Sequence, residues 1–288
     1  MHSSPQPVPV KIIVLTVIGM FAFAANSILC RLALGKDLID PASFTSIRLG
    51  SGALMLLIIL TLRQRGLPKP AFDALGASML FIYAICFSYA YVDLKTGTGA
   101  LVLFGTVQLT MILFGLVLGE RPKPLAWLGM LMAIGGLVYL LLPGVSAPPL
   151  WPAILMAVAG IAWAVYSLHG KGSTHATADT AWNFVGTLPL ALVVLVFMQD
   201  GLHSQPAGVA LALGSGALAS GVGYALWYTV LPYLSQTQAG NVQLSGPIIA
   251  AFGGVVFMSE DITLRLVIAT CLSLGGIALV IGTRSKSA

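Results

Sequence analysis

The sequence predicts an all-α membrane protein with ten transmembrane helices in two inverted five-helix repeats. Three observations support this prediction: the composition, the number of long apolar runs and an internal repeat. Of the 288 residues, 58% are hydrophobic and 8% are charged, and the mean hydropathy is +0.96. A soluble domain carries about 25% charged residues, and a chain of this size cannot bury such an apolar surplus in one aqueous core. The composition therefore excludes a soluble enzyme, a nucleic-acid binder and a disordered chain.

Ten apolar runs are each long enough to cross a bilayer, which takes about 20 residues of helix. Breaks rich in proline, glycine and charge separate them. In chain order they cover residues 11–34, 42–62, 73–93, 96–118, 123–142, 150–170, 180–198, 206–231, 236–258 and 262–283. None shows the alternating pattern of about 10 residues that marks a transmembrane β-strand, so the class is all-α.

The first run is predicted to be a retained helix. It follows a short stretch containing Pro5, Pro7 and Pro9, lacks a small-residue cleavage site and leads into further spans, unlike a signal peptide. With the N-terminus inside, nine of the 14 Lys and Arg residues fall on the cytoplasmic side and five on the other. Cytoplasmic loops are enriched in these residues, so both termini are predicted to be cytoplasmic.

An internal repeat has an offset of 140 residues. Gly119-Glu120 is followed 15 residues later by Gly135-Gly136, and Ser259-Glu260 is followed by Gly275-Gly276 at the same distance. The offset also relates three further pairs: Phe23 and Trp163, Ser27 and Ser167, and Arg31 and Lys171.

This repeat divides the chain into residues 1–143 and 144–288, with five helices each. Because five is odd, equivalent helices must cross the membrane in opposite directions. Inverted duplication of this kind is common among secondary transporters, where two halves rock around a site near the midplane.

Two segments resemble a known family. Residues 114–122 (Phe-Gly-Leu-Val-Leu-Gly-Glu-Arg-Pro) resemble the end of the fourth helix in the EamA-type drug/metabolite transporters, and residues 244–248 and 259–261 look like the matching segments of the second half. The chain is similar in particular to the bacterial aromatic amino-acid exporters of that superfamily. The resemblance implies a central cavity and export of aromatic or neutral amino acids, or related metabolites, across the bacterial inner membrane. Val107 stands where the family usually has the proline seen at Pro247, so a helix break is expected in the ninth span and not in the fourth.

Polar side chains inside spans are costly and normally face a cavity or a neighbouring helix. Asn26, Gln108 and Gln243 are predicted to contact substrate, because an amide both donates and accepts hydrogen bonds and so suits a zwitterionic amino acid. The alternative is interhelical hydrogen bonding, worth about 0.6 kcal/mol for each bond.

Aromatic side chains recur at helical spacing in the third, sixth and eighth spans. Tyr83, Trp163 and Tyr224 are predicted to bind substrate, with Tyr83 and Trp163 deep enough that the buried OH or NH needs a partner. The alternative is plain packing. Three aromatics are assigned to interfacial belts: Tyr91, Trp127 and Tyr228.

All nine acidic residues lie in loops or at span ends, so no carboxylate at the membrane centre is expected to carry a proton or bind sodium. This favours facilitated diffusion or exchange. Glu120 and Glu260 are expected to form helix-end ion pairs, with Arg121 and Arg265 respectively. His169 is expected to have a structural or interfacial role.

Arg31 and Arg48 lie just inside the outer ends of the first two spans, where snorkelling to the headgroups explains them. The alternative is a gate pairing with one of three acids: Asp37, Asp40 or Asp93.

The sequence contains no hydrolase, metalloprotease or nucleotide-binding motif, and its three cysteines lack CxxC spacing. We therefore predict no enzyme activity, no catalytic residues, no metal and no cofactor. The expected partners are a small-molecule substrate, the lipid bilayer and a possible second copy, with no nucleic acid. The cavity is expected between helices 1, 3, 4, 6, 8 and 9, with helices 5 and 10 behind it as scaffold or dimer surface. Two alternatives remain: an exporter of cationic drugs and an intramembrane lipid-modifying enzyme.

Overall fold

The computed structural model describes residues 9–64, 69, 71–119, 123–144, 146–234 and 236–284. Apart from one isolated bridge between Ile39 and Ser204, the regular structure of these residues is helical. The elements are α1 (Val10–Leu34), α2 (Pro41–Gln64), α3 (Ala74–Tyr91), α4 (Thr96–Val117), α5 (Pro124–Leu141), α6 (Leu150–His169), α7 (Ala176–Phe197), η1 (Gln199–Gly201), α8 (Pro206–Leu213), η2 (Gly214–Val222), α9 (Gly223–Val230), η3 (Leu231–Tyr233), α10 (Gln236–Gln243), α11 (Ser245–Met258) and α12 (Leu264–Arg284).

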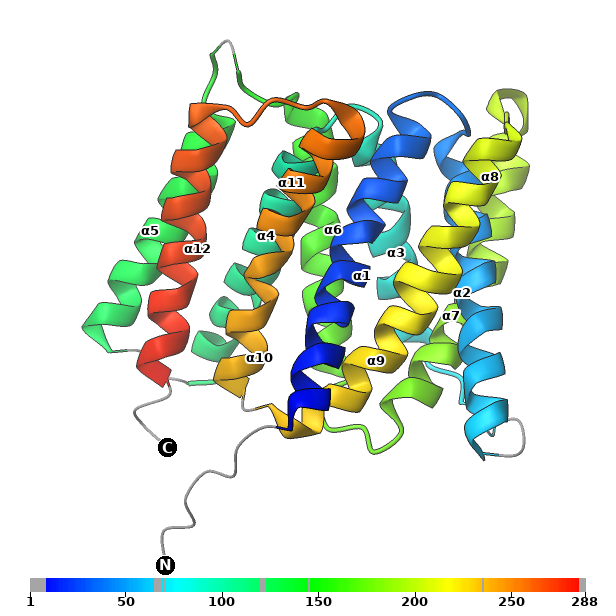
Figure 1. The fold of residues 1–288 in the computed structure, drawn as a ribbon, viewed down its shortest axis with the longest axis horizontal. Helices are drawn as coiled ribbons and strands as arrows, with labels where there is room; N and C mark the ends of the chain where they lie inside the picture. The colour runs from blue at the N-terminus through cyan, green and yellow to red at the C-terminus, as the bar shows by residue number, and fades with distance from the viewer. Residues whose placement is uncertain are drawn as a thin grey trace, which may run out of the picture.

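Ten helical stretches in this part of the chain are long and apolar enough to cross a membrane, which confirms the predicted fold class. The eighth stretch, Pro206–Tyr233, joins α8, η2 and α9, and the ninth, Gln238–Met258, contains most of α10 and all of α11. The seventh helix begins at Ala176, four residues before the predicted run. The start of α1 and the end of α12 lie at the same end of the bundle (Figure 1), as an even number of crossings requires.

The two repeats pack against each other through equivalent helices. The fifth and tenth crossings, α5 and α12, lie side by side at one edge of the bundle, and α4 packs against α11 (Figure 1). The second and seventh crossings, α2 and α7, are also neighbours. Such pairing of equivalent helices is the arrangement that inverted duplication produces.

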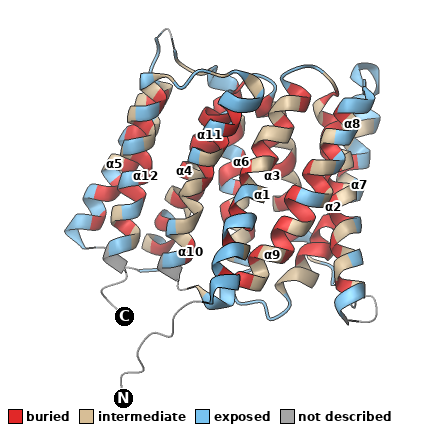
Figure 2. Ribbon diagram, viewed as in Figure 1, coloured by how far each residue is buried: buried red, intermediate tan, exposed pale blue. Residues whose placement is uncertain are grey.

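Glycines allow α5 and α12 to approach closely. A Cβ atom on Gly129 would lie 2.5 Å from the carbonyl oxygen of Gly276, and one on Gly136 would lie 2.8 Å from the backbone nitrogen of Ser273. Small residues at such contacts are the usual basis of helix packing in membranes. The outer faces of this pair are exposed (Figure 2), for example at Leu131. α5 lies outside the cavity lining as predicted for the fifth helix, but α12 lines the cavity with Val280 and Ile281, so the prediction that the tenth helix lies behind the cavity is wrong. The use of this pair as a dimer surface stays a prediction.

The ninth crossing is interrupted as expected. α10 ends at Gln243 and α11 begins at Ser245, whereas α4 runs without a break from Thr96 to Val117. Pro247 explains the interruption, because it lacks the N–H that would bond to the carbonyl of Gln243 in a continuous helix.

The eighth crossing contains a π-helical segment, η2, where the sequence is rich in glycine. Gly216 in this segment faces the backbone of Arg48 and the Ser51 hydroxyl so closely that a side chain would not fit, and a Cβ on Gly221 would lie 2.9 Å from Met55. The glycines of η2 thus bring the eighth crossing into contact with α2.

Candidate functional site

A cavity of about 1270 Å³ lies in the middle of the bundle. Residues of α1, α3, α4, α6 and α9 form its walls, as predicted for the first, third, fourth, sixth and eighth helices, and α10 contributes from the ninth. The structure adds α7 and α12 to this set. The loop residues in the lining, such as Lys171 and Leu234, follow the sixth and the eighth crossing and so belong to the end of the bundle where α1 begins and α12 ends. The cavity therefore opens at that end.

All six side chains predicted from the sequence line this one cavity: Asn26, Tyr83, Gln108, Trp163, Tyr224 and Gln243. They come from α1, α3, α4, α6, α9 and α10, so the fold brings together residues that span 217 positions of the chain (243 minus 26). Their contact with a substrate stays a prediction.

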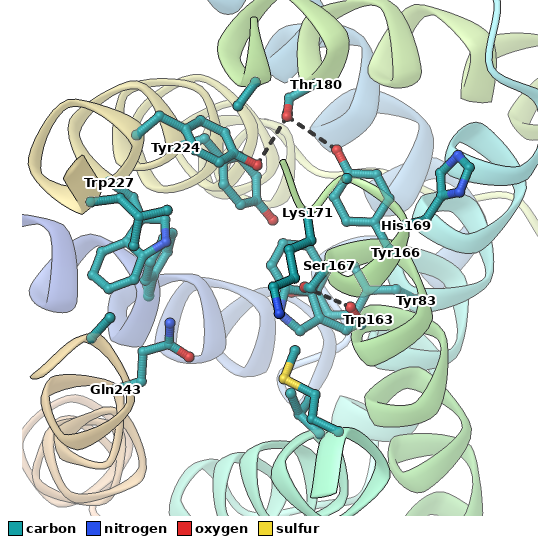
Figure 3. A pocket seen from close by; sticks show the side chains of 18 of the residues that line it. Tyr83, Trp163, Tyr166, Ser167, His169, Lys171, Thr180, Tyr224, Trp227 and Gln243 are labelled. Carbon is teal, nitrogen blue, oxygen red and sulfur yellow. Dashed lines mark hydrogen bonds between the residues drawn. The ribbon is translucent and has the colours of Figure 1, made fainter. Parts of the chain in front are cut away.

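Trp163 is the centre of an aromatic wall (Figure 3). Its ring centroid lies 4.9 Å from that of Tyr83 and 5.4 Å from that of Tyr166. The ring of Tyr224 stacks on it at 5.5 Å with an interplanar angle of 25°. Offset stacking of this kind is favourable between aromatic rings, and it presents several ring faces and edges to the cavity.

The lining also contains aromatic residues that were not among the predicted site residues, namely Phe23, Phe87, Phe104, Tyr166, Trp227 and Tyr228. The Phe23 ring lies 5.7 Å from that of Tyr224 and 5.9 Å from that of Trp227. The repeat contained the signal for Phe23, because it is the equivalent of Trp163 at the offset of 140 residues. Inverted repeats place equivalent residues on opposite sides of a shared axis, so a cavity residue in one half points to a candidate in the other.

Tyr228 lines the cavity and does not belong to an interfacial belt, contrary to the prediction. Tyr166 donates a hydrogen bond to Thr180 at 3.1 Å, and Thr180 donates to Tyr228 at 3.1 Å (Figure 3). This chain joins α6, α7 and α9 beside the mouth of the cavity.

The belt assignment is also wrong for Tyr91, which is fully buried. Its ring packs on Phe87 at 4.7 Å, and its hydroxyl donates to the carbonyl of Thr96 at 3.3 Å. A position near the end of a span did not indicate exposure here, because α3 lies inside the bundle. Trp127 is half exposed near the start of α5, where the belt assignment places it.

The three predicted amides differ in their surroundings. Gln108 is nearly buried in α4, and Gln243 ends α10 at the interrupted ninth crossing. Asn26 accepts a hydrogen bond from Ser215 of η2, which ties its oxygen to the eighth crossing. Asn26 thus makes the interhelical bond that was the alternative prediction, and its place in the lining is also compatible with the predicted contact to substrate.

Charged groups gather at the mouth of the cavity. His169 Nε2 lies 3.1 Å from a carboxylate oxygen of Asp73, Ser173 donates to Asp179, and Lys171 is exposed nearby. Asp73 also accepts a bond from the Gly76 amide at 2.9 Å and so caps α3. The residues with described placement include no group of three His, Cys, Asp or Glu side chains that could hold a metal ion.

The opposite end of the bundle is closed by Glu260. Its carboxylate accepts a bond from Arg31 Nε at 3.2 Å and from the Thr96 amide at 2.7 Å. Nη1 of Arg31 donates to two backbone carbonyls at the end of α3, that of Tyr91 at 3.1 Å and that of Val92. These contacts join α1, α3, α4 and α11 in one cluster, which we call the closed-end cluster.

The closed-end cluster corrects two predictions. Glu260 pairs with Arg31 and not with Arg265, which instead donates to the carbonyls of Leu140 and Leu142. Arg31 is bound to protein groups, so snorkelling does not describe it, and its acidic partner is none of Asp37, Asp40 and Asp93. The pairing predicted for Glu120 and Arg121 lies outside the described residues.

Arg48 does not snorkel either. Its side chain is buried, with 1% of the residue exposed, and it donates to the Tyr83 hydroxyl at 3.1 Å. Its guanidinium carbon lies 5.3 Å from the Tyr83 ring centroid and 4.9 Å from that of Phe87. Both rings line the cavity, so the positive charge lies directly behind the cavity wall.

The comparisons with known proteins agree with this architecture. The profile of the EamA-like transporter family matches residues 10–142 and 150–282. The chain is 50% identical to an uncharacterized protein of Pseudomonas aeruginosa, covering 95% of this chain and 96% of that protein. It is 27% identical to the threonine/homoserine exporter RhtA of Salmonella typhimurium, over 94% of this chain and 92% of the exporter. It is 24% identical to the uncharacterized inner membrane transporter YedA of Escherichia coli, over 87% and 75% of the two chains.

One solved structure superposes with a TM-score of 0.65 at 19% identity, covering 93% of this chain and 98% of that one. This similarity concerns the fold alone. The family match covers almost the whole chain in two repeats, and the bundle of ten crossings contains a cavity that opens at one end. The chain therefore belongs to the EamA-like transporter family, and its ten long apolar helices make it a multi-pass membrane protein.

Proposed function

We propose that this chain exports amino acids, aromatic or neutral, or related metabolites by alternating access through the central cavity. The observation that supports the proposal best is a cavity walled by aromatic rings and amides that opens at one end of the bundle. Rings take an apolar side chain, and amides both donate to and accept from polar groups. The similarity to a threonine/homoserine exporter favours amino acids among the substrates of this family.

We also propose that the two repeats meet at residues 143 and 144 and that both termini are cytoplasmic. Because the cavity opens at the end of the bundle where the first helix begins, it then faces the cytoplasm in this conformation. Export then requires the mouth to close and the closed-end cluster to separate. The described carboxylates in the cavity lining, Asp73 and Asp179, lie at the mouth. Because the described lining contains no acid deeper than these two, a facilitator or exchanger is favoured over an antiporter that protonates a buried carboxylate.

The test is uptake of labelled phenylalanine and threonine into liposomes that contain the purified protein, with and without a pH gradient. Saturable uptake above that of empty liposomes, unchanged by the gradient, is expected. Uptake that depends on the gradient would contradict the facilitator mechanism. Absence of uptake for both amino acids would reject the substrate assignment, and a panel of cationic drugs would then test the alternative exporter.

The cavity itself is tested by Trp163→Ala, Gln108→Ala and Tyr83→Ala. Each should reduce uptake at least tenfold while leaving expression normal, because each removes a large or polar group from the lining. Trp127→Ala is the matched control, since Trp127 lies half exposed on α5 away from the cavity lining. Normal uptake by all three cavity variants would place the substrate site elsewhere.

A further inference from the structure

Arg48 is a buried cation that has no counter-charge among the residues with described placement. It is the eighth residue of α2 with 1% of the residue exposed, and it takes no part in the ion pairs formed among the described residues. An ionised side chain within a membrane span is expensive to bury, and an unpaired one is the costliest case. Such a residue normally has a partner, and a substrate can supply it.

The hydrogen bonding of Arg48 is also incomplete. One of its terminal nitrogens donates to the Tyr83 hydroxyl at 3.1 Å. Its Nε and its other terminal nitrogen are buried and have no hydrogen-bond partner. Buried donors are almost always satisfied, so Arg48 is a buried cation whose charge and hydrogen-bonding capacity the surrounding described residues meet only in part.

Tyr83 connects this charge to the cavity. Because Arg48 donates to the phenol oxygen, the oxygen acts as acceptor in that bond and its own O–H remains available to a second acceptor. Tyr83 lines the cavity next to Trp163 (Figure 3). A group that accepts a bond from the Tyr83 hydroxyl would therefore lie within the aromatic wall and feel the positive charge behind it.

We propose that Tyr83 and Arg48 form a subsite for the carboxylate of the substrate. The Tyr83 hydroxyl donates to the carboxylate, and Arg48 is a positioning residue that orients the phenol and supplies the compensating charge. The rest of the substrate packs on Trp163 and Tyr224. The inference deepens the proposed function, on which it rests: it restricts substrates to molecules with an anionic group and excludes simple cationic amines.

The test compares two probes that differ in one group, 3-phenylpropanoate and 3-phenylpropanamide. Binding to the purified full-length protein is followed by quenching of tryptophan fluorescence. The carboxylate should bind at least tenfold more tightly than the amide. Arg48→Gln and Tyr83→Phe should each weaken carboxylate binding about tenfold to hundredfold, the range for a hydrogen bond to a charged group, with little change for the amide. The ratio of the two affinities is the readout, because a purely structural role would weaken both probes equally.

Arg48→Lys keeps the charge and guards against loss of folding in Arg48→Gln; it should retain a preference for the carboxylate. Arg265→Gln is the matched control, because it removes the same charge from a residue that contacts carbonyls at the end of α5. Equal binding of both probes, no binding of either, or an unchanged ratio in Arg48→Gln and Tyr83→Phe would overturn the proposal. Amino-acid uptake without any dependence on Arg48 would reject this subsite alone, whereas Arg48-dependent carboxylate binding without amino-acid uptake would reject the proposed function alone.

Discussion

Replacement of Glu260 by Gln should favour the conformation that opens at the opposite end. The Glu260 carboxylate accepts bonds from Arg31 and from the Thr96 amide, at 3.2 and 2.7 Å, and the side chains of the ion pair are 16% and 10% exposed. Solvent therefore screens the pair only weakly. These bonds join helices that must separate when the closed end opens, so their loss affects one conformation and not the other.

The size of the effect follows from the number of bonds. A hydrogen bond to a charged group contributes about 1.5–3 kcal/mol and a neutral one about 0.5–1.5 kcal/mol. Glutamine can still accept through its amide oxygen, so each of the two bonds weakens by about 1 kcal/mol. A total of about 2 kcal/mol corresponds to a shift of about 30-fold between the two conformations.

The assay uses a cysteine at Ser27, which lines the cavity, in a background where Cys30, Cys86 and Cys271 are replaced. A membrane-impermeant thiol reagent is applied at the face that carries the closed-end cluster. The Glu260→Gln variant should be labelled about 30-fold faster. Asp261→Asn is the matched control, because Asp261 is the exposed neighbour of Glu260. A rate within twofold of the parent protein, or an equal increase in the control, would show that Glu260 does not hold this end closed.

Two further predictions concern stability. Gly136→Ala should destabilise the protein by about 1–3 kcal/mol, because its Cβ would lie 2.8 Å from the Ser273 backbone nitrogen. Gly135→Ala should be neutral or stabilising, because nothing lies within 4 Å of its Cβ. Thermal unfolding of the two purified variants tests this difference, and equal melting temperatures would contradict the close packing of α5 and α12. Asp73→Ala should cost about 1 kcal/mol through loss of the cap on Gly76, while Asp73→Asn should keep most of it; the same unfolding assay would show equal losses if the cap were unimportant.

The crossings and most of the cavity could be predicted from the sequence because the bilayer imposes strong constraints. A backbone in hydrocarbon must satisfy its own hydrogen bonds, so apolar runs of the right length become helices. Polar or aromatic side chains deep in those runs, such as Gln108 and Trp163, then face the interior of the bundle. The break in the ninth crossing could be predicted for a similar reason. Pro247 has no backbone N–H, so it interrupts the helix whatever its neighbours are.

The contacts at the ends of the spans could not be predicted, because they depend on how the two repeats pack. Glu260 lies five residues from Arg265 in sequence, but its partner Arg31 is 229 residues away. The depth of a residue along a helix also does not determine which neighbours its side chain faces. Arg48 is near enough to the end of α2 to reach the headgroups, but the side of α2 on which it lies faces Tyr83 and Phe87. The sequence gives its position in the span, whereas only the packed bundle gives its neighbours.

The inverted repeat predicts that equivalent residues close opposite ends of the cavity, and Lys171 allows a test of this prediction. Lys171 is the equivalent of Arg31 at the offset of 140 residues, yet it lies exposed at the open mouth while Arg31 is held in the closed-end cluster. In an inverted duplication, the contacts that close one end in one conformation have counterparts that close the other end in the second conformation. Lys171→Gln should therefore favour the conformation described here and slow labelling of the Ser27 cysteine from the closed-end face, the opposite of Glu260→Gln. Lys11→Gln, near the start of α1, controls for loss of a positive charge. Faster labelling in Lys171→Gln would show that the two ends do not close by equivalent contacts.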